Sequence, residues 1–203
     1  FIADIGVVGL NAFKAGSQLK GIYFVGDTPG TLNSEDYEHP ENWPFNANQT
    51  VYVKQSKVNA YKTAWEKGGN TLNVTFMIPQ QTSKNGGSVC YPFDVVYPKN
   101  QGENDVKPYM TKDFTHAYNS SSPFVRAYSL DDYYVPAFVG ALIRSKQKES
   151  VTTYCQMDEN QAHNMNNVTA NGYTATGTNR MIGAVEDTPI TNPSDGQYYA
   201  FSK

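Results

Sequence analysis

The first thirteen residues constrain the fold of this chain most, because almost nothing in them favours contact with water. The segment reads FIADIGVVGLNAF, with Asp4 and Asn11 as its polar side chains. Alternate side chains of a strand face opposite ways, so a strand here presents two apolar rows, formed by Phe1, Ala3, Ile5 and Val7 and by Ile2, Val8, Leu10 and Ala12. Such a segment is expected to be buried on both faces. It is too short to cross a bilayer, which takes about 20 mostly apolar residues.

Length and composition favour one mainly β domain. The chain has 203 residues, which is enough for one sizeable core. Its 15 tyrosines, together with frequent Asn, Thr and Gly, are typical of strands and turns. The net charge of -3 offers no basic surface for nucleic acid. We therefore expect a single-domain β-sandwich or jelly roll with about one short helix, consisting of an N-terminal strand at residues 1–13 and a body at residues 14–203.

Asn-x-Ser/Thr triplets predict a secreted glycoprotein. They begin at Asn48, Asn73, Asn119 and Asn167, and none has Pro in the middle. Because the sequence starts at Phe1 rather than Met, we expect that a leader was removed or that the chain was trimmed. Localisation outside the cell, on the cell surface, follows as an expectation.

The two cysteines, Cys90 and Cys155, allow a single pairing. In an oxidising compartment a disulfide between them would close a long loop and stabilise the fold by about 2–4 kcal/mol. The alternative is a pair of buried free thiols.

Hydrophobic periodicity predicts one helix among many short strands. The helix is expected at residues 56–69, where Ser56 can cap the start, Gly68 and Gly69 can end it, and apolar residues recur at helical spacing. Segments 1–13 and 19–25 are interpreted as a hairpin. Further strands are expected at residues 71–78, 89–97, 124–130, 133–143, 151–157, 173–176, 180–185 and 197–201, and loops at residues 26–48 and 98–122. The alternative for residues 133–143 is a helix with Pro136 at its first position, but Tyr, Val and the interior Gly140 favour a strand.

No residue pattern predicts catalysis, so we expect no enzyme, no cofactor and no metal site. The histidines His39, His116 and His163 lack a second ligand at metal-binding spacing. A phosphate-binding glycine loop and a nucleophile elbow are both missing from the sequence.

Two weaker alternatives involve sugars. Paired carboxylates are what glycoside hydrolysis needs, with Asp94, Asp131, Asp132 and Glu186 as candidates. Exposed aromatic rings can stack on sugars, with Trp43, Tyr133 and Tyr134 as candidates for a secreted, lectin-like carbohydrate-binding β-sandwich.

The residues after the apolar segment resemble a known family. The stretch Asn11-Ala12-Phe13-Lys14-Ala15-Gly16 is similar to the start of the TasA and camelysin biofilm fibre proteins and of the archaeal bundling pilins. In that family a strand-forming segment is followed by a Phe, a small residue, a Gly and an apolar strand, and here Phe13, Ala15, Gly16 and Leu19 hold those places. The resemblance covers about the first twenty residues.

The resemblance implies a subunit whose N-terminal strand completes the sheet of the next subunit. The interface would consist of Phe1, Ile2, Ala3, Ile5, Val7, Val8 and Leu10, with Ala3, Gly6 and Gly9 setting its register and a turn at residues 14–17 acting as hinge. An unpaired edge strand is a template for another chain, and a head-to-tail contact that does not close grows into a filament. We therefore expect a pilus or biofilm matrix fibre whose partners are copies of the same chain and neighbouring filaments, which supports adhesion or cell bundling. The alternative is that the segment pairs within its own chain.

Overall fold

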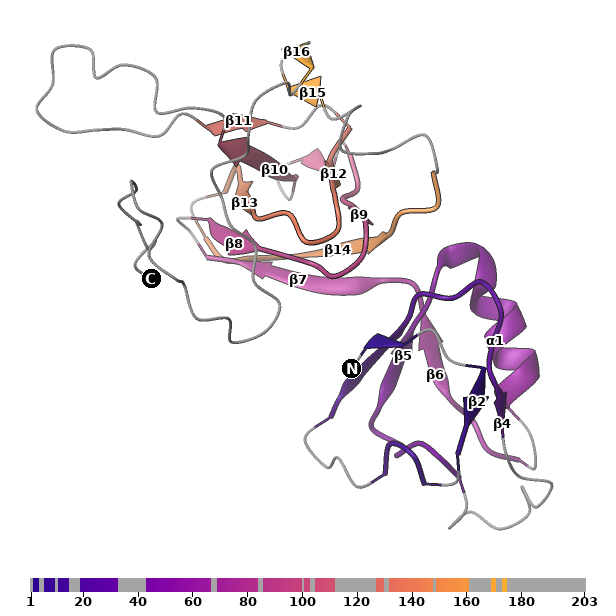
Figure 1. The fold of residues 1–203 in the computed structure, drawn as a ribbon. Coiled ribbons are helices and arrows are strands. Elements are labelled where there is room, and N and C mark those ends of the chain that lie inside the picture. The colour runs from indigo at the N-terminus through magenta and orange to yellow at the C-terminus, as the bar shows by residue number, and fades with distance from the viewer. Residues whose placement is uncertain are drawn as a thin grey trace, which may run out of the picture.

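The computed structural model describes residues 2–3, 6–9, 11–14, 19–32, 43–66, 69–83, 86–99, 101–102, 105–111, 127–129, 132–147, 149–160, 169–170 and 173–174. These residues form two lobes (Figure 1), each around its own cluster of buried apolar side chains. The first lobe consists of the described residues up to 75, and the second lobe consists of the described residues 78–160. Strands dominate both lobes, so the predicted mainly β fold is confirmed.

The first lobe is built on a parallel sheet. Its order is β1 (Ile2–Ala3), β3 (Gly21–Phe24), β5 (Thr50–Tyr52) and β6 (Asn73–Thr75), and every neighbouring pair is parallel. A second parallel pair joins β2 (Val7–Val8) to β4 (Thr31–Leu32). Between β5 and β6 the chain passes through the 3-10 turn η2 (Gln55–Lys57) and helix α1 (Val58–Trp65). Parallel neighbours need a crossover of this kind, which a direct hairpin turn cannot supply.

Helix α1 covers one face of this sheet and confirms the predicted helix, although it ends at Trp65 rather than near Gly69. Tyr61 and Trp65 are four residues apart and therefore share one side of the helix. This side is buried and faces the sheet. The Trp65 ring packs edge-on against Phe24 at 4.8 Å between centroids, and its indole Nε1 donates to the Gly30 carbonyl at 2.6 Å. The Tyr61 hydroxyl donates to the Gly26 carbonyl at 3.2 Å.

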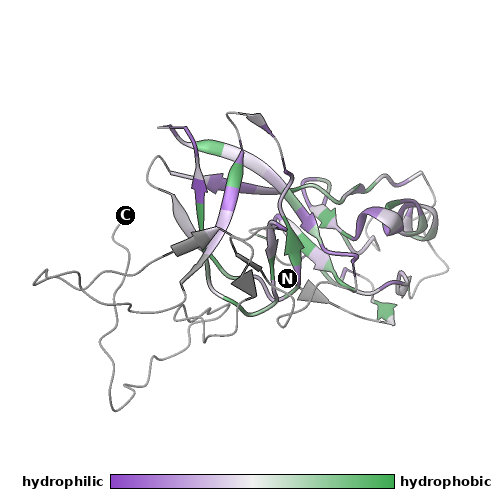
Figure 2. Cartoon of the chain, turned by 90° about the horizontal axis from the view of Figure 1, so that it is seen from above, coloured by the Kyte–Doolittle hydropathy of each residue, from purple (hydrophilic) through white to green (hydrophobic). Residues whose placement is uncertain are grey.

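The second lobe has two antiparallel sheets (Figure 1). One contains β11 (Ala127–Ser129), β10 (Val106–Thr111), β13 (Ala141–Ser145) and β8 (Gly87–Val89), in that order. The other contains β12 (Tyr134–Val135), β9 (Val95–Val96), β14 (Val151–Met157) and β7 (Ile78–Thr82). Burial alternates along β14, where every second residue is buried, including the polar Thr153. Figure 2 shows that the strands carry both apolar and polar residues. A separate pair joins β15 (Thr169–Ala170) to β16 (Tyr173–Thr174).

Several predicted elements differ from the structure. The strand expected at residues 71–78 is divided between β6 and β7, the strand expected at residues 89–97 is divided between β8 and β9, and the loop expected at residues 26–48 contains β4. The expected hairpin of segments 1–13 and 19–25 is wrong, because β1 and β3 run parallel. The expected loop at residues 98–122 contains β10, a strand whose Pro108 argues against a ladder position by sequence. The single strand expected at residues 133–143 is two strands, because the backbone turns at residues 137–138 with a positive φ of 60° at Phe138. The strands expected at residues 180–185 and 197–201 lie outside the described residues.

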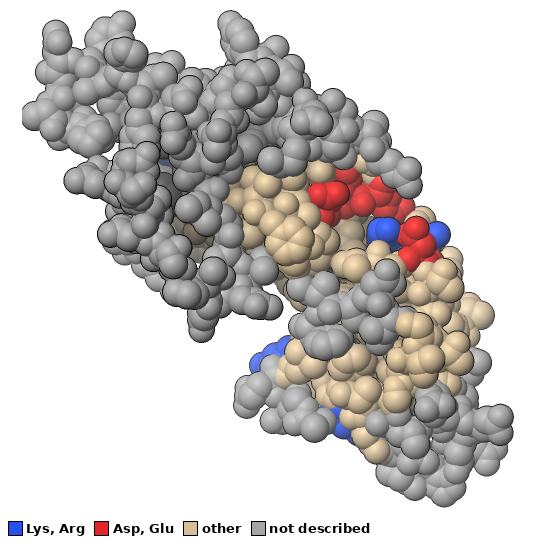
Figure 3. Space-filling model, viewed as in Figure 1, with Lys and Arg blue, Asp and Glu red and all other residues tan. Residues whose placement is uncertain are grey.

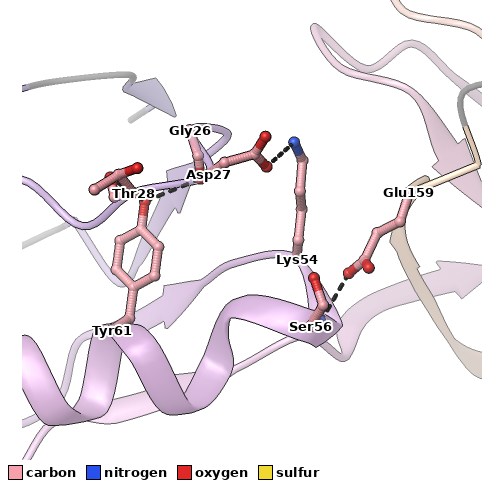
Figure 4. A network of polar contacts seen from close by, with 7 residues as sticks. All are labelled: Gly26, Asp27, Thr28, Lys54, Ser56, Tyr61 and Glu159. Carbon is pink, nitrogen blue, oxygen red and sulfur yellow. Dashed lines mark hydrogen bonds and ion pairs between the residues drawn. The ribbon is translucent and has the colours of Figure 1, made fainter.

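The two lobes meet through side chains of both. In Figure 4 the first turn of the helical segment lies beside a loop of the second lobe, and the Ser56 amide donates to Glu159 Oε1 at 2.9 Å. Nearby, Lys54 Nζ and Asp27 Oδ1 form an ion pair at 2.7 Å within the first lobe. Figure 3 shows acidic and basic side chains gathered at this junction. Tyr23 and Tyr52 of the first lobe also pack against the buried cluster of the second lobe.

Candidate functional site

The N-terminal segment is paired with two different strands of its own chain. Ile2 and Ala3 of β1 pair with Tyr23 and Phe24, and Val7 and Val8 of β2 pair with β4. The Thr31 amide adds a hydrogen bond to the Gly6 carbonyl at 2.8 Å. Each ladder is two residues long, and β1 lies at the edge of its sheet. Short ladders at an edge hold a segment with few main-chain hydrogen bonds.

The side chains of β2 divide between solvent and core. Val8 is 2% exposed and belongs to the cluster of the first lobe, whereas Val7 is 59% exposed. This alternation is what a strand with one buried face requires. One side chain therefore fills a place in the core, and its neighbour faces outward.

Phe13 anchors the end of the segment. Its ring stacks on Phe45 with centroids 5.3 Å apart and meets Phe24 edge-on at 6.1 Å. Its amide donates to the Pro44 carbonyl at 2.9 Å, and its own carbonyl accepts from Gln49 Nε2 at 2.9 Å. Phe13 is thus held by both its side chain and its backbone.

A turn separates the two ladders from this anchor. The Ala12 amide donates to the Gly9 carbonyl at 3.3 Å, the Lys14 amide donates to the Asn11 carbonyl at 3.0 Å, and Asn11 has a positive φ of 55°. The turn formed by Gly9 and residues 11–14 is a second candidate for the hinge, beside the predicted residues 14–17, of which residues 15–17 lie outside the described part. An added Cβ at Gly6 or Gly9 would meet no atom within 4 Å, so neither glycine sets the register by a close approach.

The predicted interface residues are only partly placed. Ile2 and Ala3 lie in β1, and Val7 and Val8 lie in β2. Phe1, Ile5 and Leu10 lie outside the described residues. The first lobe includes Val8 and Phe13 in its buried cluster, so the end of the segment is part of the core of that lobe.

Two of the four predicted glycosylation sites can be placed. Asn48 lies in the turn before β5 and Asn73 is the first residue of β6, and both are exposed. Asn119 and Asn167 lie outside the described residues. Exposure on the surface of the first lobe is compatible with modification at both placed asparagines.

The expected disulfide is not formed in the structure, where Cys90 and Cys155 are both free thiols. Cys155 lies on β14 with its side chain in the core, and its Sγ is 3.7 Å from the Tyr91 hydroxyl and 3.6 Å from the Ile78 carbonyl oxygen. Burial raises the pKa of the Cys155 thiol to about 11. Burial also raises the pKa of the Tyr91 and Tyr97 hydroxyls, which are 2.7 Å apart.

The predicted sugar platform does not exist on the surface. Trp43, Tyr133 and Tyr134 are all buried, so none offers a ring face to a bound sugar. The Tyr133 hydroxyl donates to Asp105 Oδ2 at 2.8 Å, and the Tyr134 hydroxyl is hydrogen-bonded to the Asp94 carboxylate. Aromatic residues are more often buried in a core than exposed as ligand platforms, and all three of these residues are buried.

The candidate catalytic carboxylates have structural partners where they are described. Asp94 Oδ1 accepts from the Ala137 amide at 2.8 Å, and Asp132 Oδ1 pairs with Lys99 Nζ at 3.2 Å. Asp131, Glu186 and the three histidines lie outside the described residues. Within the described ranges no group of three or more His, Cys, Asp and Glu side chains converges to hold a metal ion.

A small cavity of about 230 Å³ lies at the junction of the lobes, lined by Val25, Lys54, Phe93, Asp94, Ala137, Met157 and Asp158. Its polar lining is already paired: Lys54 with Asp27, Asp94 with Ala137, and Asp158 Oδ1 with the Asn160 amide at 3.0 Å. Each of these contacts lies within one lobe, so the polar side chains around the cavity stabilise the lobe to which they belong.

Sequence reasoning missed the residues that hold the anchor. Gln49 is buried and bonds both the Phe13 carbonyl and the Asn46 amide, and Asn46 Nδ2 donates to the Lys14 carbonyl at 3.1 Å. Both lie in a Pro- and Asn-rich stretch that reads as an exposed loop, so no periodic signal marks them.

No family model matches the chain, and no curated protein or solved structure is significantly similar to it. No helix among the described residues is long and apolar enough to cross a membrane.

Proposed function

We propose that the chain is a structural subunit of an extracellular filament, a pilus or matrix fibre, in which residues 1–8 of one copy pair with β3 and β4 of the next. The single observation that carries the proposal is the division of the N-terminal segment at residues 9–12. Beyond that turn Phe13 is anchored in the core, and before it the chain is held by two ladders of two residues each.

The free energy difference between the self-paired and the exchanged state is small, because the segment makes the same contacts in both states. Val8 would fill the same place in the core of the first lobe, and β1 the same edge of the parallel sheet, whichever copy supplies them. Only the hinge differs between the two states. An exchange that passes from copy to copy without closing produces a filament.

The hinge itself favours opening. Asn11 has a left-handed φ of 55°, a conformation that costs an L-residue about 1–2 kcal/mol, although Asn adopts it more readily than most residues. In an extended, donated segment this residue would return to the ordinary β region. The free energy difference between closed and exchanged states therefore depends on residue 11.

Truncation of residues 1–8 tests the proposal. The shortened chain keeps Phe13 and should stay monomeric, and a synthetic peptide of residues 1–10 should bind it. Electron microscopy and sedimentation of the purified full chain and the truncated chain give the readout. Filaments that persist after the truncation would falsify the proposal.

Two neighbouring valines provide a matched pair that keeps the chain length. Val8→Asn places an amide in the core position, whereas Val7→Asn changes a side chain that is already exposed. We expect Val8→Asn to abolish assembly and Val7→Asn to preserve it. Equal loss in both variants would show that the core position on β2 is not what drives assembly.

A further inference from the structure

The face of the parallel sheet opposite α1 carries a set of polar and aromatic side chains. Ile22, Val51 and Val74 are buried in the cluster of the first lobe. Because side chains alternate along a strand, the residues on either side of them share the other face, namely Gly21, Tyr23, Thr50, Tyr52, Asn73 and Thr75.

A chain of polar contacts crosses two strands on this face. Asn73 pairs with Thr50 in the parallel ladder, and Asn73 Nδ2 donates to Thr50 Oγ1 at 2.9 Å. The Thr50 side chain is in turn hydrogen-bonded to the Tyr52 hydroxyl. The Thr50 hydroxyl therefore bridges the Tyr52 side chain and Asn73, the first residue of the triplet Asn73-Val74-Thr75.

The Tyr52 ring is covered by Tyr23 on the side of β3, while on the side of β6 Thr75 pairs with Tyr52 and Asn73 pairs with Thr50. Tyr52 stacks on Tyr23 with centroids 4.8 Å apart and planes inclined by 17°. Since β5 lies between β3 and β6, a ring that stacks on a β3 residue presents its other face toward β6. Both rings lie over Gly21, where an added Cβ would come within 3.2 Å of Tyr52 Cε2.

We propose that Asn73 carries an N-linked glycan whose first sugar residue packs on the β6-facing side of the Tyr52 ring. The exposed Asn73 amide is accessible to a transferase, and the half-buried Tyr52 lies beside it. In the transfer, the Asn73 Nδ2–C1 bond forms, the C1–O bond to a polyprenyl phosphate or diphosphate carrier breaks, and one amide proton leaves. The second N–H of the amide remains and still donates to Thr50 Oγ1.

The inference is independent of polymerisation, because it concerns a face that the N-terminal segment does not pair with. Asn48 provides the internal comparison. It is also exposed, but it lies in the turn before β5, whereas Asn73 lies in β6 and donates to the Thr50 side chain that bonds Tyr52. We therefore expect a glycan at Asn48 to make no contact with the Tyr52 ring.

The experiment uses the full chain with Asn73 as its one remaining acceptor, made by Asn48→Gln, Asn119→Gln and Asn167→Gln, and produced with and without glycosylation. Mass spectrometry of the tryptic glycopeptide measures occupancy, and urea unfolding measures stability. The comparison is repeated with Tyr52→Thr and with Tyr52→Phe, which keeps the ring. A matched chain retains Asn48 alone.

We expect Asn73 to be occupied and its glycan to lower the unfolding equilibrium constant by about two- to tenfold with Tyr52 or Tyr52→Phe, in the range of contacts made by one aromatic ring. Glycosylation should leave the unfolding equilibrium constant unchanged in the Tyr52→Thr variant and in the chain that retains Asn48 alone. Contacts between sugar and Tyr52 ring protons in nuclear Overhauser spectra provide a second readout that needs no variant at residue 52. The inference would be overturned if Asn73 were unoccupied, or if the glycan stabilised the chain equally with Tyr52 and with Tyr52→Thr. It would also be overturned if no contacts between the sugar and the Tyr52 ring protons were found.

Discussion

The side-chain amide of Gln49 donates to the main-chain carbonyl of Phe13 at 2.9 Å, in a buried bond that joins residues 36 positions apart. The same side chain accepts from the Asn46 amide at 2.8 Å through Oε1. One buried glutamine therefore fixes the end of the N-terminal segment against the loop that precedes β5. The described residues before Phe13 have contacts of their own in the β1–β3 and β2–β4 ladders.

Replacing Gln49 by Ala should destabilise the chain by about 2–3 kcal/mol. The Phe13 carbonyl and the Asn46 amide would both lose a partner, and an unsatisfied buried polar group costs about 1–3 kcal/mol. Urea unfolding measures the change. Gln101→Ala is the control, since Gln101 is exposed and its bond to the Lys99 carbonyl is long at 3.4 Å. A Gln49→Ala variant as stable as this control would contradict the role assigned to Gln49.

Tyr133→Phe should destabilise the second lobe by about 3 kcal/mol. Asp105 is 4% exposed, its Oδ2 accepts from the Tyr133 hydroxyl, and its Oδ1 has no partner within the described part of the chain. Loss of the hydroxyl leaves the whole carboxylate buried without a hydrogen bond. Calorimetry of the variant gives the shift, with Tyr154→Phe as the control because Tyr154 is half exposed. An equal loss of stability in the two variants would show that the hydrogen bond to Asp105 does not cause the effect of Tyr133→Phe.

The two thiols should differ in reactivity. Cys155 is fully buried, whereas Cys90 is partly exposed, and the structure leaves them unpaired. Iodoacetamide should label Cys90 alone in the native chain and both cysteines in urea, as peptide mass spectrometry can determine. Failure to label either cysteine in urea without a reductant would mean that the disulfide first expected from the sequence does form.

Stability should fall as the pH rises above 9, and Cys155 should account for the first part of the fall. Burial raises the pKa of this thiol from 9.0 to about 11, so its contribution is fully present below pH 9 and is lost as the pH rises through that interval. At pH 10 the loss should be about 1.4 kcal/mol. Urea midpoints at pH 8 to 10 measure it, and Cys155→Ala should show a shallower slope. Parallel slopes for the two chains would refute this assignment.

Residue patterns predict the fold where burial follows a simple period. The β-branched residues of the segment 151–157 and the helical spacing of Tyr61 and Trp65 each predict an element without help from distant residues, and both elements are present. The parallel order of the first sheet is not visible in this way. Whether a strand pairs parallel or antiparallel depends on the path of the connection, and β1 and β3 are joined through β2 and a turn rather than by a hairpin.

The candidate site could be predicted in part, because the burial of some of its residues follows from their apolar character. The apolar character of residues 1–13 predicts burial, and Val8 and Phe13 are buried. The predicted hinge at residues 14–17 rests on Gly16 and Ser17, which are strong turn residues by composition and lie outside the described residues. The left-handed conformation of Asn11 has no signal of that strength in the sequence. Trp43, Tyr133 and Tyr134 were mistaken for surface aromatics. Trp43 lies in a loop-like stretch without a periodic signal, and the nearly continuous apolar run at residues 133–143 does not show which of its side chains face inward.

The most direct test of strand exchange uses the partners Val7 and Thr31, which face each other in the β2–β4 ladder and are both exposed. Neighbouring strands lie about 4.8 Å apart, within the range that a disulfide spans. The variant carries Val7→Cys and Thr31→Cys in a Cys90→Ser background, with the buried Cys155 retained, and each single cysteine variant is a control. After oxidation of assembled material, a non-reducing denaturing gel should show a ladder of dimers, trimers and longer chains. A single band of internally crosslinked monomer would show that each segment stays in its own subunit and would contradict the account.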